Sequence, residues 1–266
     1  MGGKLSFIEK ELSPYVIERL EEWTRGISDI EVLSNQGWTS AVRKIAGGGE
    51  AFLFKSCFEE RYRDWLRNEA EVLRSLKDCA AIPVPGYYDF FEEADASHLL
   101  MSFEPGITLR EALLREQTAK GEYQLIKSFG AFLQKLHEQE LPSFFPAGKN
   151  WLDEQLQRAA GYLEGGGIDG TAALLEKLEH ERPAEVRQTI IHGDCTVDNV
   201  LVVNGEVVMF IDTAGMGVGD PRYDEALAVR KFLGNPEKLD AFYDGYTRCR
   251  LSDEEFQYFE GLYDFF

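Results

Sequence analysis

The residues best suited to chemistry gather around one predicted hairpin in the second half of the chain. Two apolar runs within residues 200–211 flank Asn204-Gly205, and this pattern predicts a two-residue β-turn between paired strands. Such a turn sets Asn199 opposite Phe210 and places Asp212 about 7 Å from Asn199 across the strand pair. An amide oxygen and a carboxylate then lie at the open end of the hairpin. Oxygen ligands in that arrangement suit a hard cation such as Mg²⁺.

A further carboxylate precedes the hairpin. Asp194 lies five residues before Asn199, and Asp212 lies thirteen residues after it. The first interval is that of a kinase catalytic loop, in which an Asp receives the hydroxyl proton and an Asn holds a metal ion. Asp212 takes the place of the second metal-binding Asp of kinases, although Thr213-Ala214-Gly215 follows it and the usual Phe is absent. The spacing predicts phosphoryl transfer from ATP to a hydroxyl group.

The first half of the chain offers a partner for the phosphates of ATP. Lys55 ends an apolar strand, as a phosphate-binding lysine does in kinases. Glu69 lies on the next predicted helix, where its carboxylate could hold the ammonium group of Lys55 toward the α- and β-phosphates. Glu71 is the alternative partner on the same helix, and the charges of this helix could also form only a solvated face.

Three segments together resemble the aminoglycoside phosphotransferase family: HGDCTVDN at residues 192–199, ID at 211–212 and GDPRYD at 219–224. The resemblance extends from Gly37-Trp38-Thr39-Ser40 to the end of the chain. Within the family it is closest to the aminoglycoside 3′-phosphotransferases, in length and in the acidic and aromatic ending at 262–266. It implies a protein-kinase-like α+β fold with two lobes, a small antiparallel β-sheet lobe and a larger, mainly helical lobe.

The resemblance implies roles for the residues that match the family motifs. Asp194 would be the catalytic base, with Asn199 and Asp212 as Mg²⁺ ligands. Lys55 would contact the phosphates of ATP, with Glu69 as its partner.

The resemblance also implies an adenine site. Ser102 and Glu104 would offer backbone groups to the base, and Met101 would lie beside the ring. Leu53 and Ile211 would enclose the base from its two faces. The 3′ branch typically has an aromatic ring at the position of Leu53, which is a departure in this chain.

The acceptor contacts are implied in the same way. Acidic side chains and the terminal carboxylate of the family bind a polyamine-like sugar, which implies Asp264 and the carboxylate of Phe266 as contacts. Asp198 lies in the catalytic loop beside the expected acceptor and is a third candidate. The alternative for the acidic C-terminal segment is a solvated helix face. Gly215 stands where the 3′ branch has an Arg, and this departure bears on the substrate and not on the reaction.

Periodicity places these residues in two predicted domains, residues 1–103 and 104–266. The first contains a helix that starts at Ser13-Pro14, with Val16, Leu20 and Trp23 on one face. Its other predicted elements are strands at 30–33, 41–45, 51–55, 87–91 and 98–103 and a helix at 61–76. The second contains the hairpin and helices at 123–139, 151–163, 171–180, 224–233, 239–249 and 253–265, the second and third of these joined by Gly165-Gly166-Gly167.

Some polar residues favour structural roles. We expect Asp220 and Asp224 to cap a helix and brace the catalytic loop. His192 should orient this loop through hydrogen bonds. The remaining histidines, His98, His137 and His180, are predicted to be structural. Trp38 is expected to pack, in a Ser34–Ser40 loop that would cover phosphates.

Composition excludes several other classes of protein. The chain has 28 Lys and Arg against 47 Asp and Glu, a net charge of −19. This charge repels DNA and RNA, and it either attracts a cationic small molecule or serves solubility alone. The four cysteines form no C-x-x-C pair, which favours free thiols in a reducing compartment. No run is apolar enough for a signal peptide or a membrane span. We expect a cytoplasmic monomer or weak dimer that acts on a small hydroxyl-bearing molecule.

Three functions are compatible with these residues. The first is 3′-phosphorylation of an aminoglycoside antibiotic. The second is a metabolic kinase of the same fold for another amino sugar, a choline-like alcohol or a macrolide. The third is a pseudokinase that binds a nucleotide without turnover, against which the complete set of Lys55, Asp194, Asn199 and Asp212 argues.

Overall fold

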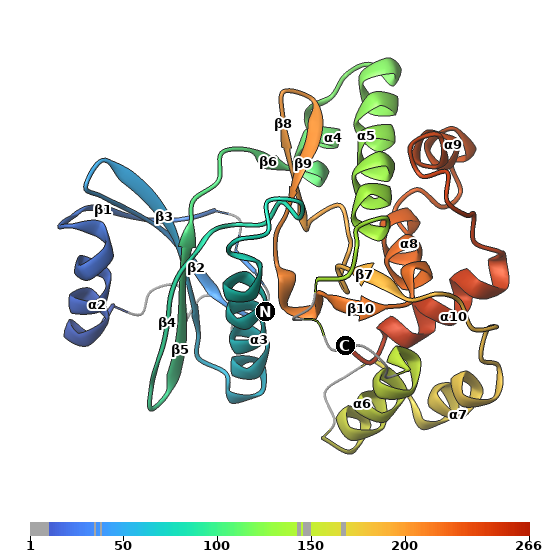
Figure 1. Ribbon diagram of the computed structural model, residues 1–266, viewed down its shortest axis with the longest axis horizontal. Coiled ribbons are helices and arrows are strands. Elements are labelled where there is room, and N and C mark those ends of the chain that lie inside the picture. The colour runs from blue at the N-terminus through green and yellow to red at the C-terminus, as the bar shows by residue number, and fades with distance from the viewer. Residues whose placement is uncertain (1–10, 35, 38, 143–144, 146–149, 166–168) are drawn as a thin grey trace. The chain divides into compact units, whose positions relative to one another are not determined.

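The computed structural model describes residues 11–266 apart from 35, 38, 143–144, 146–149 and 166–168 (Figure 1). Contacts divide the chain into two compact units, an N-terminal unit at Met1–Pro105 and a C-terminal unit at Gly106–Phe266. The predicted boundary lay between residues 103 and 104. Trp38, part of the expected phosphate-covering loop, and Gly166-Gly167 of the predicted linker lie outside the described residues.

The N-terminal unit is built on one antiparallel sheet of five strands in the order β1-β2-β3-β5-β4. This agrees with the five strands predicted from the sequence. The elements of the unit are α2 (Pro14–Thr24), β1 (Ile27–Val32), β2 (Ala41–Gly47), β3 (Glu50–Cys57), α3 (Glu60–Leu76), β4 (Tyr87–Glu93) and β5 (Ala96–Ser102). Ser13 caps α2 by accepting a hydrogen bond from Val16 N, and Pro14 follows at the first helical position, as the sequence predicts.

Strand β3 directs alternate side chains to opposite faces of the sheet. Phe52 and Phe54 are buried in a cluster with Leu20 of α2. Leu53 faces the other way, in a cluster with Leu66 of α3. Figure 1 shows α2 and α3 on opposite sides of this sheet. Lys55 therefore lies on the face that α3 covers, because it is two residues from Leu53.

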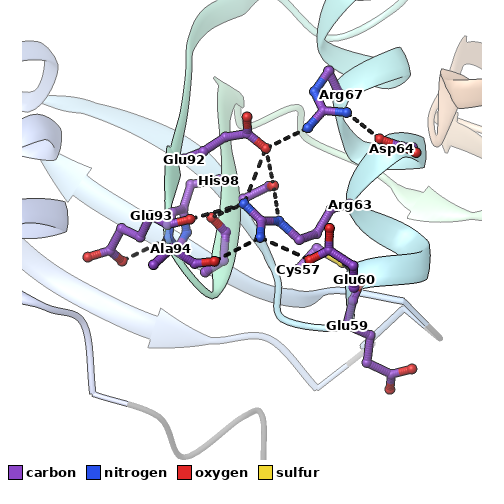
Figure 2. Close-up of polar contacts among 12 residues, drawn as sticks. Cys57, Glu59, Glu60, Arg63, Asp64, Arg67, Glu92, Glu93, Ala94 and His98 are labelled. Atoms are coloured by element: carbon purple, nitrogen blue, oxygen red, sulfur yellow. Dashed lines mark hydrogen bonds and ion pairs between the residues drawn. The ribbon is translucent and has the colours of Figure 1, made fainter.

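Helix α3 is fixed to the turn between β4 and β5 by an arginine (Figure 2). Arg63 donates from Nε to Ser97 Oγ at 2.8 Å and from its terminal nitrogens to the carbonyl oxygens of Glu93 and Ala94 at 3.0 and 3.1 Å. One turn later, Arg67 donates to Glu92 at 2.9 Å. These contacts set the position of α3 on the sheet and thereby the position of any carboxylate farther along it.

The C-terminal unit is mainly helical. Its elements are β6 (Ile107–Thr108), α4 (Leu109–Arg115), α5 (Ala119–His137), α6 (Trp151–Gly165), α7 (Ala172–His180), β7 (Thr189–Ile191), β8 (Val200–Val203), β9 (Glu206–Phe210), a short 3₁₀ turn (Thr213–Gly215), β10 (Gly217–Gly219), α8 (Pro221–Val229), α9 (Pro236–Gly245) and α10 (Asp253–Tyr263). Strands β6, β8 and β9 form one small sheet, and β7 pairs with β10 in another. Every helix predicted for this half is present.

Three helices begin three or four residues earlier than predicted. Helix α5 begins at Ala119 and not at Tyr123, after a Thr118 cap. Helix α8 begins at Pro221 because Asp220 caps it, accepting a hydrogen bond from Arg222 N. Helix α9 begins at Pro236 after an Asn235 cap. A polar cap followed by Pro favours a helix start, and hydrophobic spacing alone placed the starts of α8 and α9 three residues too late.

Of the three residues predicted to share one face of α2, Trp23 is the one that is not buried. Val16 and Leu20 are buried, whereas Trp23 is 41% exposed and contacts Tyr88 edge-on at 5.5 Å between ring centroids. All four cysteines are free thiols, as predicted. Within the described part of the chain, no helix combines the length and the apolar character needed to cross a membrane.

Candidate active site

The hairpin of β8 and β9 positions the predicted metal ligands, with a register that differs from the prediction. Asn204 and Gly205 have φ angles of 51° and 82°, as a two-residue turn of this type requires. A bulge then shifts the pairing by one residue, because Val208 has no partner on β8. The predicted pairing of Asn199 with Phe210 is therefore wrong. Instead, Ile211 N donates to Asn199 O at 3.0 Å, and Asp212 directly follows this pair.

Asn199 closes the catalytic loop onto Asp194. Its side-chain nitrogen Nδ2 donates to the backbone oxygen of Asp194 at 2.9 Å and to the carboxylate oxygen Oδ2 at 2.7 Å. Both contacts depend on the five-residue interval between Asp194 and Asn199. Because the two amide hydrogens are occupied, Oδ1 of Asn199 is the atom with lone pairs to offer a cation.

A second donor to Asp194 was missed from the sequence. The hydroxyl of Tyr263 donates to Asp194 Oδ1 at 3.1 Å. The two residues are 69 positions apart, so no local spacing connects them. The acidic and aromatic C-terminal segment was the available signal, but it was interpreted only through Asp264 and Phe266.

Asp224 braces the catalytic loop by accepting hydrogen bonds from its backbone, as predicted. Its Oδ2 accepts from His192 N at 2.6 Å, and its Oδ1 accepts from Gly193 N at 2.8 Å. His137 Nε2 also lies 3.2 Å from Oδ2. Asp224 is completely buried in α8, so these donors replace the water that its carboxylate would otherwise bind.

The predicted orienting role of His192 is confirmed by its two ring contacts. Asp194 N donates to His192 Nδ1 at 3.2 Å, so Nδ1 is the acceptor nitrogen. The other nitrogen, Nε2, must then carry the proton and donate to Ile211 O at 2.9 Å. Complete burial lowers the pKa of His192 and favours this neutral form. The imidazole thus ties the loop before Asp194 to the strand end before Asp212.

Two glycines allow the loop and the segment after Asp212 to approach closely. Gly193 has φ of 82°, and a Cβ added there would lie 2.3 Å from Gly215 O. A Cβ at Gly215 would lie 3.1 Å from the Cα of Gly193. A larger residue at position 215 would have to displace the catalytic loop.

The N-terminal unit holds the predicted lysine in a buried ion pair. Lys55 Nζ lies 2.8 and 2.9 Å from the two carboxylate oxygens of Glu69. Lys55 is 7% exposed and Glu69 is 5% exposed, whereas Glu71 lies on the exposed side of α3. Of the two candidate partners, Glu69 is therefore the one that binds Lys55.

Residues 30–256 match the family described as the phosphotransferase enzyme family, APH. The chain belongs to this family. It is therefore a phosphotransferase, and kinases of this family act on hydroxyl groups. A curated relative, the aminoglycoside 3′-phosphotransferase of Streptomyces fradiae, is 26% identical over 220 residues, which cover 76% of this chain and 80% of the relative.

Solved structures of similar proteins support the fold. An aminoglycoside 3′-phosphotransferase of type VIII has a TM-score of 0.77 at 23% identity, and the match covers 94% of this chain and 97% of that one. APH(3″)-Id from Streptomyces rimosus, in complex with ADP and streptomycin, has a TM-score of 0.71 at 19% identity, with 96% and 99% covered. This likeness confirms the predicted kinase-like α+β fold.

The electrostatics of the catalytic loop favour a cation in this member of the phosphotransferase family. Burial and then the charge of Asp212 raise the pKa of Asp194 to about 7, while hydrogen bonds from Tyr263 and Asn199 oppose the rise. A divalent cation beside Asp212 would offset this repulsion. Among the residues that the structure describes, no three His, Cys, Asp or Glu side chains could hold a metal on their own. One amide and one carboxylate fit Mg²⁺, which commonly takes its remaining ligands from phosphates and water.

The residues implied for adenine lie in both units. In the N-terminal unit, Leu53 pairs with Met101 across β3 and β5, and Met101 is buried. Ser102 N donates to Gly86 O at 2.8 Å, so the carbonyl of Ser102 is the backbone group that could meet the base. The side chain of Glu104 accepts a hydrogen bond from Ser102 Oγ, which holds the following segment close to β5.

Ile211 follows β9 in the C-terminal unit, where its N–H is bonded to Asn199 O. It is partly buried and immediately precedes Asp212.

The residues implied for the acceptor have different surroundings. Asp198 is bound through both carboxylate oxygens by Arg110, which reduces the charge that it can offer to a cationic acceptor. Asp264 is exposed, and its carbonyl accepts from Gly170 N at 2.8 Å. Phe266 packs against Tyr162, with the guanidinium of Arg158 located 5.1 Å from its ring centroid.

Proposed function

We propose that this phosphotransferase is an ATP- and Mg²⁺-dependent kinase that phosphorylates the 3′-hydroxyl of an aminoglycoside. One observation supports this function most strongly. The carboxylate of Asp194 is held by Asn199, five residues away, at the end of a hairpin that continues into Asp212. This is the order of base, metal ligand and metal ligand that phosphoryl transfer to a hydroxyl uses.

In the proposed reaction, Asp194 orients the acceptor hydroxyl and accepts its proton. The acceptor oxygen forms a bond to the γ-phosphorus in line with the breaking bond, and the electron pair of that bond leaves with ADP. Lys55, held by Glu69, neutralises charge on the phosphates. When bound, Mg²⁺ held by Asn199 and Asp212 would stabilise the charge that develops on the transferred group. No covalent phosphoenzyme is needed.

The adenine contacts follow the same family pattern. The carbonyl of Ser102 and the backbone at Glu104 would bind the edge of the base. Leu53, Met101 and Ile211 would supply apolar contacts to its ring. An aliphatic residue at position 53 gives less contact area than an aromatic ring, so nucleotide affinity would depend more on the phosphates.

The names of the relatives support an aminoglycoside as the acceptor. The curated relative and the structure with the TM-score of 0.77 are both 3′-phosphotransferases. The net charge of −19 favours a polycation, and Asp264 and the terminal carboxylate of Phe266 would contact its ammonium groups. Asp198 would join them only by releasing Arg110.

That pairing of Asp198 with Arg110, together with Gly215, favours a second candidate. A kinase of the same fold that acts on another amino sugar, a choline-like alcohol or a macrolide would need fewer acidic contacts. The reaction at Asp194 would be the same.

A matched pair of acceptors tests the proposal. Kanamycin B and tobramycin differ by the 3′-hydroxyl, which tobramycin lacks. With ATP and Mg²⁺, we expect ADP release with kanamycin B and only background release with tobramycin. Equal turnover of both would contradict the 3′ position, and turnover only with choline or erythromycin would support the second candidate. Tight ATP binding without turnover of any acceptor would indicate a pseudokinase.

A further inference from the structure

The Asp194 carboxylate is held at both of its oxygens by uncharged donors. Asn199 Nδ2 donates to Oδ2 at 2.7 Å, and the Tyr263 hydroxyl donates to Oδ1 at 3.1 Å. Asn199 belongs to the same loop, whereas Tyr263 comes from the last turn of α10. A single hydrogen bond leaves a carboxylate free to rotate about its bond to Cβ. Donors on both oxygens fix the plane of the group.

Helix α10 is anchored in a way that fixes the Tyr263 ring. Ser252 and Glu255 form a capping box at its first turn, and Arg222 of α8 donates to Glu255 at 2.7 Å. At the other end, the guanidinium of Arg230 lies 4.8 Å from the centroid of the Tyr263 ring. These contacts fix the Tyr263 ring independently of its hydrogen bond to Asp194.

A second tyrosine of α10 shows what a structural role looks like on the same helix. Tyr258 is buried, and its hydroxyl donates to the backbone carbonyl of Leu178 at 3.0 Å. Tyr263 instead donates to the proposed base. Burial and the charge of Asp194 raise the pKa of Tyr263, so its hydroxyl keeps its proton and acts as a donor.

We propose that Tyr263 is a positioning residue that fixes the orientation of the Asp194 carboxylate toward the acceptor hydroxyl. This inference rests on the proposed role of Asp194 as the base. An ionised carboxylate has about four lone-pair positions, so the bonds from Asn199 and Tyr263 leave others for the acceptor. The acceptor proton moves to Asp194, and Tyr263 keeps its own.

The test compares Tyr263→Phe with Tyr258→Phe, since each removes one hydroxyl from α10. ADP release is measured with ATP and Mg²⁺, once with kanamycin B and once without an acceptor, where water takes its place. We expect Tyr263→Phe to lower kcat about tenfold while the KM for ATP stays within about twofold. Tyr258→Phe should lower the melting temperature and leave kcat within about twofold.

Two results would overturn the inference: a kcat for Tyr263→Phe that stays at or above that of the wild type in both assays, or an equal loss in Tyr258→Phe. Asp194→Asn is measured in parallel to separate this inference from the proposed function. An inactive Asp194→Asn with a fully active Tyr263→Phe would overturn the positioning role alone. An active Asp194→Asn would remove the proposed base, and with it the inference.

Discussion

The two charged centres of this kinase-like chain are stabilised in opposite ways. Lys55 and Glu69 form a buried pair in which each charge compensates the other. Around the Asp194 carboxylate, the hydrogen-bond donors that the structure describes are the amide of Asn199 and the phenol of Tyr263, and the charge of Asp212 repels that of Asp194. The difference indicates that Glu69 orients the lysine, whereas the catalytic loop brings two like charges close together, as the proposed Mg²⁺ site would require.

The largest expected effect on stability comes from breaking the compensated pair. Lys55→Met leaves Glu69 buried without its ammonium partner, which should lower the free energy of unfolding by about 3–5 kcal/mol. The double variant Lys55→Met/Glu69→Leu removes both charges and should recover a large part of the loss. Urea unfolding measures the free energy of unfolding of the wild type, of Lys55→Met and of the double variant.

The matched control for this variant is a surface pair. Arg115→Met breaks the exposed bridge to Glu111 and should cost at most about 0.5 kcal/mol. If the double variant is as unstable as Lys55→Met, charge compensation is not what holds this pair.

The next effect concerns the two carboxylates of the catalytic site, Asp194 and Asp212. Asp212→Asn removes the charge of the proposed metal ligand and should lower kcat about 10²-fold. Because the ligand is weakened and not deleted, excess Mg²⁺ should restore part of the rate. Asp240→Asn, at an exposed ion pair with Arg250, is the control and should behave as the wild type. A variant at position 212 that is insensitive to Mg²⁺ would contradict the assignment.

The close approach of the catalytic loop to Gly215 can be tested with two glycines of equal φ. Gly193 and Gly205 both have φ of 82°, but only Gly193 has backbone atoms where a Cβ would lie. Gly205→Ala should therefore cost about 1 kcal/mol for its left-handed conformation. Gly193→Ala should cost at least about 2 kcal/mol in unfolding experiments, since it adds the clash. Equal losses would show that the loop can move away freely.

The smallest effect is a pH dependence that originates in the N-terminal unit. Burial lowers the pKa of His98, despite the nearby carboxylate of Glu93. In the unfolded chain, His98 is protonated more readily, with a pKa of about 6.5. Stability from this group is therefore present above that pH and is lost as the pH falls toward the lower folded pKa, by at most about 1.4 kcal/mol per pH unit.

Melting temperatures between about pH 7 and pH 5 measure this slope. The melting temperature of His98→Gln should fall less steeply with decreasing pH than that of the wild type. His180 is exposed, so the melting temperature of the control His180→Gln should fall as steeply as that of the wild type. Parallel curves for all three proteins would exclude His98 as a source of acid sensitivity.

The sequence predicts contacts that depend on short intervals. Lys55 and Glu69 could be paired because β3 alternates its faces and the next helix covers one of them. Asp194 and Asn199 could be paired because five residues separate them. The role of Asp224 could be expected for a similar reason, since the family motif carries it.

The sequence does not predict contacts that depend on tertiary structure. The predicted hairpin register is wrong by one residue because no residue pattern indicates the bulge at Val208. Tyr263 was missed because its contact with Asp194 spans 69 residues and depends on how α10 is anchored. The close approach of Gly193 to Gly215 also depends on tertiary structure, so the sequence does not predict it. In contrast, the Asn235 cap is readable from the sequence but was not predicted, and the cap that was correctly expected at Asp220 was not used to place the start of α8.

The role of Asp194 as the catalytic base is tested by phosphoryl transfer with the Asp194→Asn variant. Wild type and variant are incubated with Mg²⁺, kanamycin B and ATP labelled at the γ-phosphoryl group, and the label on the acceptor is followed over time. We expect labelled kanamycin B with the wild type and a rate lower by about 10²–10⁴-fold with the variant, although ATP still binds to it. Transfer by Asp194→Asn at the wild-type rate, or label that accumulates on the protein, would contradict this expectation.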